Sequence, residues 1–205
     1  MSINILFRLI GVVVLIGIWH LTQSILGKRG LPDDGKIGDK IHIWMAPLHA
    51  YLARTPWAVS ALLITSSLGI DLLGLSVLYL GIFGPSFRPI IGLVALLMLR
   101  QSAQYLTALP APEGMIWRNP GFPSLFVTYG VSNDLFFSGH TGLAVYGALT
   151  LASVGIPWLT ALVILVGLYE IFAVLALRAH WTMDVYAGLV SAILCWVVSG
   201  IFPNL

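Results

Sequence analysis

The chain has 205 residues, of which 59% are hydrophobic and only 9% are charged, and its formal net charge is +2. A soluble domain carries about 25% charged residues, so this composition excludes a soluble globular protein. It also excludes a disordered chain, which needs low hydrophobicity and high charge. The isoelectric point of 8.8 reflects a few loop cations rather than a basic face, so no nucleic-acid partner is expected. The mean hydropathy of +0.96 indicates an integral, multi-pass membrane protein.

A helix needs about 20 mostly apolar residues to cross a bilayer, and six stretches of the chain approach that length. In chain order they lie near residues 5–26, 57–83, 87–109, 139–154, 157–177 and 182–202. The first lacks the cationic start and the cleavage site of a secretory signal, so we expect a retained anchor helix. The fourth is short and rich in Gly and Ala. The sequence therefore predicts an all-α, polytopic fold, a bundle of about six transmembrane helices in one domain over residues 1–205.

Two long connections separate these stretches. Residues 1–56 hold the anchor helix and a loop, in which residues 41–53 mix apolar side chains with His42 and His49; this mixture predicts an interfacial helix. Residues 57–205 hold the remaining helices and the connection 110–137, which is rich in Pro and Gly and cannot be helical throughout. A loop of this length in a small protein is often a lid or a binding element.

Ionisable side chains at membrane depth are costly and usually line the interior of a bundle or a wet cavity. Chain direction through six helices sorts these residues by membrane face. Six polar residues then fall toward helix ends on one face: Arg100, Asp134, His140, Arg178, His180 and Asp184. The sequence predicts a functional site at that face.

The spacing within this set indicates nucleophilic and acid–base chemistry. His180 and Asp184 are four residues apart, so they share a face if the last helix begins near His180. A carboxylate that binds one imidazole nitrogen fixes the tautomer and leaves the other nitrogen free as a nucleophile or base. His140 could protonate a departing oxygen as a general acid. A structural role for these residues and a metal site are the competing interpretations.

The remaining candidates suit a phosphate group. Arg178 offers a fork of donors for two phosphate oxygens, and Arg100 adds a second cation. Ser138 and Gly139 precede a helix whose free backbone N–H groups and dipole favour an anion. Asp134 and Glu170 are secondary candidates.

Two motifs carry a family resemblance. Ser138-Gly139-His140-Thr141, with Asp134 four residues before the serine, is followed by the segment Arg178-Ala-His180-Trp-Thr-Met-Asp184-Val. Together they resemble the lipid phosphate phosphatase/phosphotransferase superfamily. The closer likeness is to the sphingomyelin synthase branch, which includes the plant phosphatidylcholine:diacylglycerol cholinephosphotransferases. Arg100 and the later Leu-Pro-Ala-Pro turn also match that branch. The phosphatases have a Lys where this chain has Gly81, which favours the transferase branch.

The resemblance implies a membrane lipid head-group phosphotransferase. Its substrates would be a phospholipid donor and a lipid-alcohol acceptor such as diacylglycerol or ceramide. His180 would attack the lipid phosphate, Asp184 would orient it, and His140 would protonate the leaving alcohol. The resulting phosphohistidine would pass its phospho-alcohol group to the acceptor. No metal or organic cofactor is expected. The resemblance covers roughly residues 99–188, and the first 90 residues carry little of it.

Two alternatives remain open from the sequence. Water could replace the lipid alcohol, which would make the protein a lipid phosphate or diphosphate phosphatase. A non-enzymatic membrane scaffold or transporter is the second alternative. The side of the membrane is also open: the cations of residues 27–56 favour a cytoplasmic site, whereas the resemblance favours an outward or lumenal one.

Overall fold

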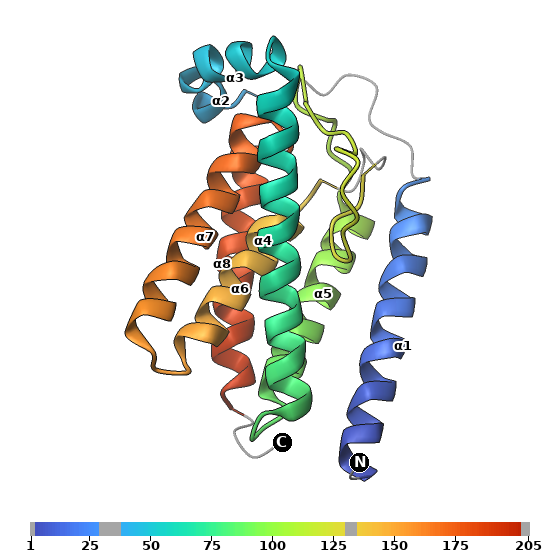
Figure 1. Ribbon diagram of the computed structural model, residues 1–205. Helices are drawn as coiled ribbons and strands as arrows, with labels where there is room; N and C mark the ends of the chain where they lie inside the picture. The colour runs from blue at the N-terminus through green and yellow to red at the C-terminus, as the bar shows by residue number, and fades with distance from the viewer. Residues whose placement is uncertain (1–2, 29–37, 130–134, 202–205) are drawn as a thin grey trace.

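The computed structural model describes residues 3–28, 38–129 and 135–201 (Figure 1). Helices make up 73% of the structure, and the described residues contain no strand. The fold is therefore all-α, as the composition predicts. In chain order the helices are α1 (Ile3–Leu26), α2 (Lys40–Trp44), α3 (Ala46–Ala53), α4 (Pro56–Phe83), α5 (Arg88–Leu106), α6 (Gly139–Ala152), α7 (Pro157–Ala176) and α8 (Thr182–Ser199).

Five of these helices, α1, α4, α5, α7 and α8, are long and apolar enough to cross a membrane. The remaining predicted stretch forms α6, which has 14 residues and is shorter than the about 20 that a span requires. It packs in the middle of the bundle against α4, α7 and α8. In Figure 1 α6 begins part-way down the bundle, below the level of α2 and α3. The start of α6 is therefore enclosed by other helices.

Glycine allows α8 to lie directly against the start of α6. A Cβ on Gly188 would come within 2.7 Å of the Ser138 carbonyl oxygen, closer than real Cβ contacts allow. Only a residue without a side chain lets the two backbones approach this far. The two sequence motifs that define the candidate site are brought together at this contact.

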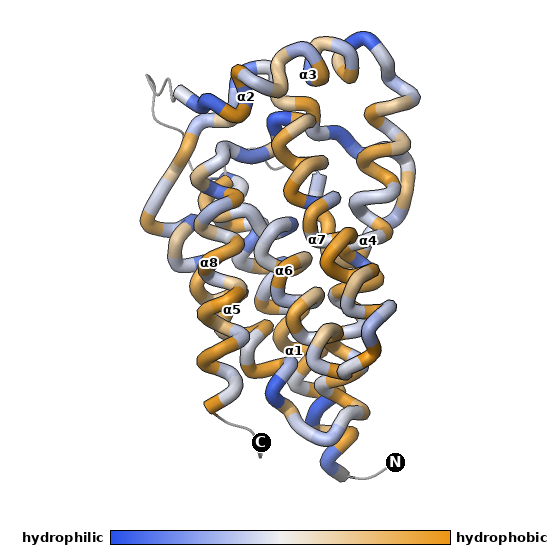
Figure 2. The backbone as a smooth tube through the Cα atoms, turned by 90° about the vertical axis from the view of Figure 1, so that its left-hand side faces the viewer, coloured by the Kyte–Doolittle hydropathy of each residue, from blue (hydrophilic) through white to orange (hydrophobic). Residues whose placement is uncertain are grey.

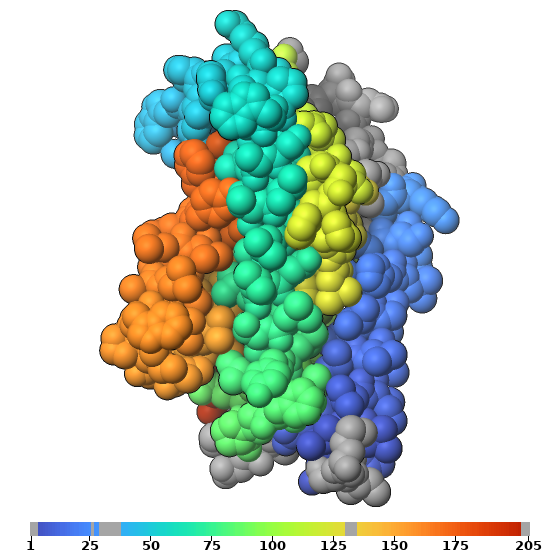
Figure 3. Space-filling view, in the orientation of Figure 1, coloured from blue at the N-terminus to red at the C-terminus, as the bar shows by residue number. Residues whose placement is uncertain are grey.

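Helix α1 lies at the side of the bundle, where it contacts α4 and α5 (Figures 1 and 3). Only 6% of its most apolar stretch is buried within the protein, against 44% for α4. Its outward side chains, among them Phe7, Val13 and Leu21, are large, apolar and exposed. Figure 2 shows apolar residues along the whole length of the helices. A surface of this kind is suited to lipid rather than water.

Residues 41–53, for which the sequence predicts one interfacial helix, lie in two short helices, α2 and α3; their location at the membrane interface stays a prediction. The chain breaks at Met45 because Pro47 stands in the first turn of α3, where proline is compatible with a helix start but not with continuation of the preceding helix. Both short helices lie across one end of the bundle (Figure 1).

The described part of the long connection after α5 is not helical, as its Pro and Gly content predicts. Asp71, on α4, holds it in place. Its carboxylate accepts hydrogen bonds from the Ser124 hydroxyl (2.8 Å) and from the backbone N–H groups of Leu125 and Phe126 (3.0 Å each). Asp71 therefore stabilises the connection against α4 and does not lie among the candidate site residues.

Candidate active site

A hydrogen bond joins the start of α6 to the start of α8. Ser138 is the N-cap of α6, and its hydroxyl oxygen accepts from the backbone N–H of Thr141 at 3.3 Å. The Ser138 backbone N–H donates to the carbonyl oxygen of Asp184 at 3.0 Å. Ser138 is fully buried. Its role in the described structure is to cap α6 and to connect the two motifs.

His180 and Asp184 lie side by side, as their spacing predicts. His180 Nδ1 is 3.6 Å from Asp184 Oδ2, just beyond hydrogen-bonding distance, and has no closer partner. Asp184 is completely buried, and its Oδ2 also accepts from the Trp181 backbone N–H at 2.9 Å. Catalytic hydrogen bonds are often long in the absence of substrate. This geometry directs Nδ1 of His180 to the carboxylate and leaves Nε2 as the nitrogen available for reaction.

His140 lies on the first turn of α6, next to an aromatic side chain of the long connection. Its ring meets Trp117 edge to face, with ring centroids 5.0 Å apart. Trp117 is itself held by a hydrogen bond from Nε1 to the Thr128 carbonyl oxygen (3.2 Å). His140 Nε2 is buried and has no hydrogen-bond partner in the structure. A buried polar atom without a partner is uncommon, so this nitrogen is placed to bind a ligand atom.

Arg100 approaches the start of α6 from α5. Its Nε donates to the Phe137 carbonyl oxygen at 3.1 Å, and its Nη1 donates to Gln23 Oε1 at 3.3 Å. A Cβ on Gly139 would lie 2.8 Å from Arg100 Nε. Gly139 is therefore the residue that lets the guanidinium reach the N-terminus of α6. Gln23 was not among the residues predicted for the site, and the only signal for it in the sequence is a polar side chain near the end of an apolar span.

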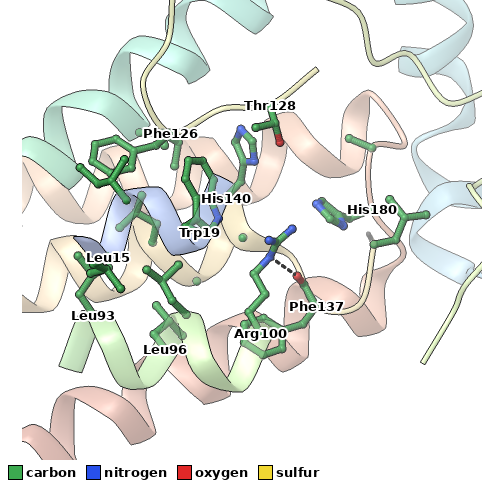
Figure 4. Close-up of a pocket in the computed structure, with 18 of the residues that line it drawn as sticks. Leu15, Trp19, Leu93, Leu96, Arg100, Phe126, Thr128, Phe137, His140 and His180 are labelled. Atoms are coloured by element: carbon green, nitrogen blue, oxygen red, sulfur yellow. Dashed lines mark hydrogen bonds between the residues drawn. The ribbon is translucent and has the colours of Figure 1, made fainter. Parts of the chain in front are cut away.

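A cavity of about 1030 Å³, its open mouth included, extends from these groups into the bundle. Figure 4 shows the rings of His140 and His180 and the guanidinium of Arg100 at one end, and Leu15, Leu93 and Leu96 at the other. The apolar walls come from α1, α4, α5, α6 and the long connection, and they include the aromatic rings of Trp19, Trp117 and Phe126. The cavity therefore joins a cationic end to a long apolar part.

Two predicted site residues, Arg178 and Glu170, lie away from the cavity lining. The backbone of Arg178 is left-handed (φ 52°), and its guanidinium donates to the carbonyl oxygens of Glu113 (2.9 Å) and His42 (3.4 Å) rather than lining the cavity. Glu170, on α7, is fully buried, accepts from the Ser66 hydroxyl at 2.5 Å and does not line the cavity either. Asp134 lies outside the described residues.

A second group of residues, not predicted from the sequence to belong to the site, supports the turn that carries His180. His42 Nε2 donates to the His180 carbonyl oxygen at 3.0 Å. Asp39 accepts from the Thr182 backbone N–H (2.6 Å) and hydroxyl (2.7 Å). Burial raises the pKa of Asp39, but the hydrogen bonds from Thr182, together with the backbone N–H and the ring of His42, outweigh it and hold that pKa below its ordinary value. Burial lowers the pKa of His42, so this imidazole is neutral at pH 7.

Among the described residues, no group of three or more His, Cys, Asp and Glu side chains is placed to hold a metal ion. The expectation that no cofactor is required stays a prediction.

The apolar helices and the paired histidine motifs define the class: an integral, multi-pass membrane protein of the lipid phosphatase/phosphotransferase type. A family model, AtPDCT1/2, matches residues 39–201, most of the chain. The chain therefore belongs to the phosphatidylcholine:diacylglycerol cholinephosphotransferase family, an enzyme family that acts on phospholipid head groups. Searches of curated proteins and of solved structures gave no significant match. The matched region begins at Asp39, so α1 lies outside it.

Proposed function

We propose that the protein transfers a phosphocholine-type head group from a phospholipid to diacylglycerol through a phosphohistidine on His180. The observation that carries this proposal is the two-part cavity, in which two histidines and an arginine face one end and apolar side chains line the rest. A phospholipid has the same division between a charged head and an apolar body. Ligand sites typically combine such apolar walls with a few convergent polar groups.

The first chemical step forms a bond between His180 Nε2 and phosphorus. The bond between phosphorus and the diacylglycerol oxygen breaks as this bond forms, and His140 donates a proton to the departing oxygen. Asp184 stabilises the imidazole through Nδ1. Arg100 lowers the energy of the transition state by binding the negative charge of the phosphate oxygens. The products are free diacylglycerol and a phosphohistidine that carries the head group.

The second step reverses the first with another lipid alcohol. The incoming hydroxyl gives its proton to His140, its oxygen attacks phosphorus, and the bond between phosphorus and His180 Nε2 breaks. The apolar lining supports a lipid alcohol over water as the acceptor, because it favours acyl chains and limits the access of water. Trp19 and Trp117 in the cavity wall support a quaternary ammonium head group, since aromatic faces attract such cations.

The test is a transfer assay on the purified protein with choline-labelled phosphatidylcholine and unlabelled diacylglycerol of a distinguishable acyl composition. The proposal predicts label in the new phosphatidylcholine, none of it with His180→Ala. Release of water-soluble phosphocholine without transfer would support a hydrolase instead. Equal transfer by wild type and His180→Ala would contradict the histidine mechanism, whereas no product from either protein would favour a non-enzymatic scaffold or transporter.

The apolar part of the cavity can be tested separately on α1. Leu15 lines the cavity and is 9% exposed, whereas Val14, the preceding residue, faces outward and is 54% exposed. Leu15→Trp should raise KM for long-chain phosphatidylcholine about 10-fold, because the larger side chain removes space that the acyl chain occupies. It should change KM for dihexanoyl phosphatidylcholine much less. Val14→Trp is the matched control, and an equal effect of the two variants would contradict an acyl-chain site against α1.

A further inference from the structure

The turn between α7 and α8, residues 177–181, is held by hydrogen bonds from α2. His42 Nε2 donates to the carbonyl oxygen of His180 at 3.0 Å, and the His42 ring stacks on Trp181 with centroids 5.5 Å apart. The Asp39 carboxylate binds the backbone N–H and the hydroxyl of Thr182, the first residue of α8. The side chains of His42 and Asp39 are 7% and 6% exposed, so these bonds are shielded from water.

Asp39 caps two helices at once. Its Oδ1 accepts from the backbone N–H groups of Ile41 and His42 and so forms the N-cap of α2. Its Oδ2 accepts from Thr182, whose N–H lies in the first turn of α8 and has no partner within that helix. One carboxylate therefore connects the α2 start to the α8 start. The His180 backbone is therefore held on two sides. His42 binds its carbonyl oxygen, and Asp39 binds Thr182, two residues later.

We propose that His42 and Asp39 are positioning residues, which set the orientation of the His180 imidazole for attack on phosphorus. This inference rests on the proposed function, in which His180 is the nucleophile. The His180 carbonyl belongs to the residue whose ring reacts, so fixing that peptide group restricts where the ring can point. Misplacement of a reacting group by about 1 Å costs on the order of 10²-fold in rate. The contact between His180 Nδ1 and Asp184 Oδ2, at 3.6 Å, depends on the same turn.

The protein contains a matched comparison for this role. His49, on α3, is also buried, and its Nδ1 donates to the Ala176 carbonyl oxygen at 3.0 Å. This bond lies at the same end of the bundle as the bond from His42. Both run from an imidazole nitrogen to a backbone carbonyl oxygen, and both are 3.0 Å long. His49 binds the end of α7, four residues before His180, and does not touch the His180 peptide. A purely structural role predicts similar consequences for the loss of either bond.

The experiment compares His42→Phe with His49→Phe in the transfer assay and in thermal unfolding. Each substitution keeps an aromatic ring and removes the hydrogen bond to the carbonyl. We expect His42→Phe to lower kcat about 10- to 100-fold with little change in KM. His49→Phe should keep kcat near that of wild type, while the two variants lower the unfolding temperature to a similar extent. His42→Gln, whose amide N–H can donate to the same carbonyl, should recover part of the lost kcat.

Thr182→Val provides a second variant if His42→Phe fails to fold. Valine keeps the shape of threonine and removes only the hydroxyl donor to Asp39, so kcat should fall by several-fold, and Thr182→Ser should retain activity. Equal losses of kcat in His42→Phe and His49→Phe, or an unchanged kcat in Thr182→Val, would overturn the positioning role. Absence of transfer by the wild type would instead contradict the proposed function and the positioning role together.

Discussion

The two ends of the bundle both contain arginine, but they differ in how completely their buried polar atoms are paired. At the end where α4 stops and α5 starts, Arg8 donates to the Ile82 carbonyl oxygen at 3.0 Å. Arg88 donates to the Trp196 carbonyl oxygen at 3.1 Å and lies over its ring, 4.8 Å from the centroid. These carbonyls are in the last turns of α4 and α8, where intrahelical partners are missing. The arginines at this end therefore serve as helix caps.

At the opposite end, buried polar atoms of the described residues remain without a partner. They include His140 Nε2, His180 Nδ1 and Asp184 Oδ1. Leaving a buried polar group unpaired costs about 1–3 kcal/mol, so a cluster of such groups beside a cavity is better explained by a ligand than by stability. The pairing of buried polar atoms, rather than the presence of charge, therefore distinguishes the candidate active site from the end where the arginines cap helices.

Among the substitutions that distinguish the two ends, Asp184→Asn should cause the largest loss of kcat. The amide oxygen can still accept from the Trp181 N–H, but the side chain loses the charge that stabilises the His180 imidazole. We expect kcat to fall about 10³-fold or more. Asp71→Asn is the control, because Asp71 binds the long connection and not His180. Transfer assays measure both variants, and retained activity in Asp184→Asn would show that the carboxylate does not assist His180.

Arg100→Lys tests whether the arginine at the candidate site contributes to activity, in contrast to the helix-capping arginines at the opposite end. Lysine keeps the charge but loses the fork of donors that can bind the Phe137 carbonyl and phosphate oxygens together. We expect kcat/KM for phosphatidylcholine to fall about 10²-fold. Arg88→Lys, at the other end, should lower the unfolding temperature slightly and leave kcat/KM unchanged. The same loss of kcat/KM in both variants would remove the distinction between the two ends.

Gly139→Ala should have a smaller effect that reports on the approach of Arg100 to α6. The new Cβ would stand 2.8 Å from Arg100 Nε, so the guanidinium must move. We expect kcat/KM to fall about 10-fold and the free energy of unfolding to fall by about 1–3 kcal/mol. Gly17→Ala is the control, since a Cβ there meets no atom within 4 Å. Lipid transfer and thermal unfolding are measured on both variants. Wild-type kinetics for Gly139→Ala would contradict a role for the contact between Arg100 and the start of α6.

The sequence predicts the parts of the site that depend on local periodicity. The four-residue spacing places His180 beside Asp184, and the Ser-Gly-His order places an N-cap and a histidine at the start of a helix. The all-α membrane fold likewise follows from the apolar stretches, because only helices of that length satisfy their backbone groups in lipid.

Contacts between distant segments could not be predicted in this way. Gln23 reaches Arg100, and Asp39 reaches Thr182, across 77 and 143 positions of the chain. Spacing also cannot indicate the left-handed backbone at Arg178, which accompanies its bonds to Glu113 and His42. The role of Arg178 in binding phosphate stays a prediction. So do the single-domain organisation and the side of the membrane that the site faces.

Trapping of the covalent intermediate tests the phosphohistidine mechanism most directly. Wild-type protein would be mixed with phosphatidylcholine labelled in its phosphate, without acceptor, then denatured at alkaline pH and mapped by mass spectrometry. The phosphohistidine mechanism predicts a phosphocholine adduct on His180 that disappears when diacylglycerol is added before denaturation. His140→Gln should accumulate little adduct, because the first leaving group lacks its proton donor. An adduct on another residue, or efficient transfer by His180→Ala, would contradict this mechanism.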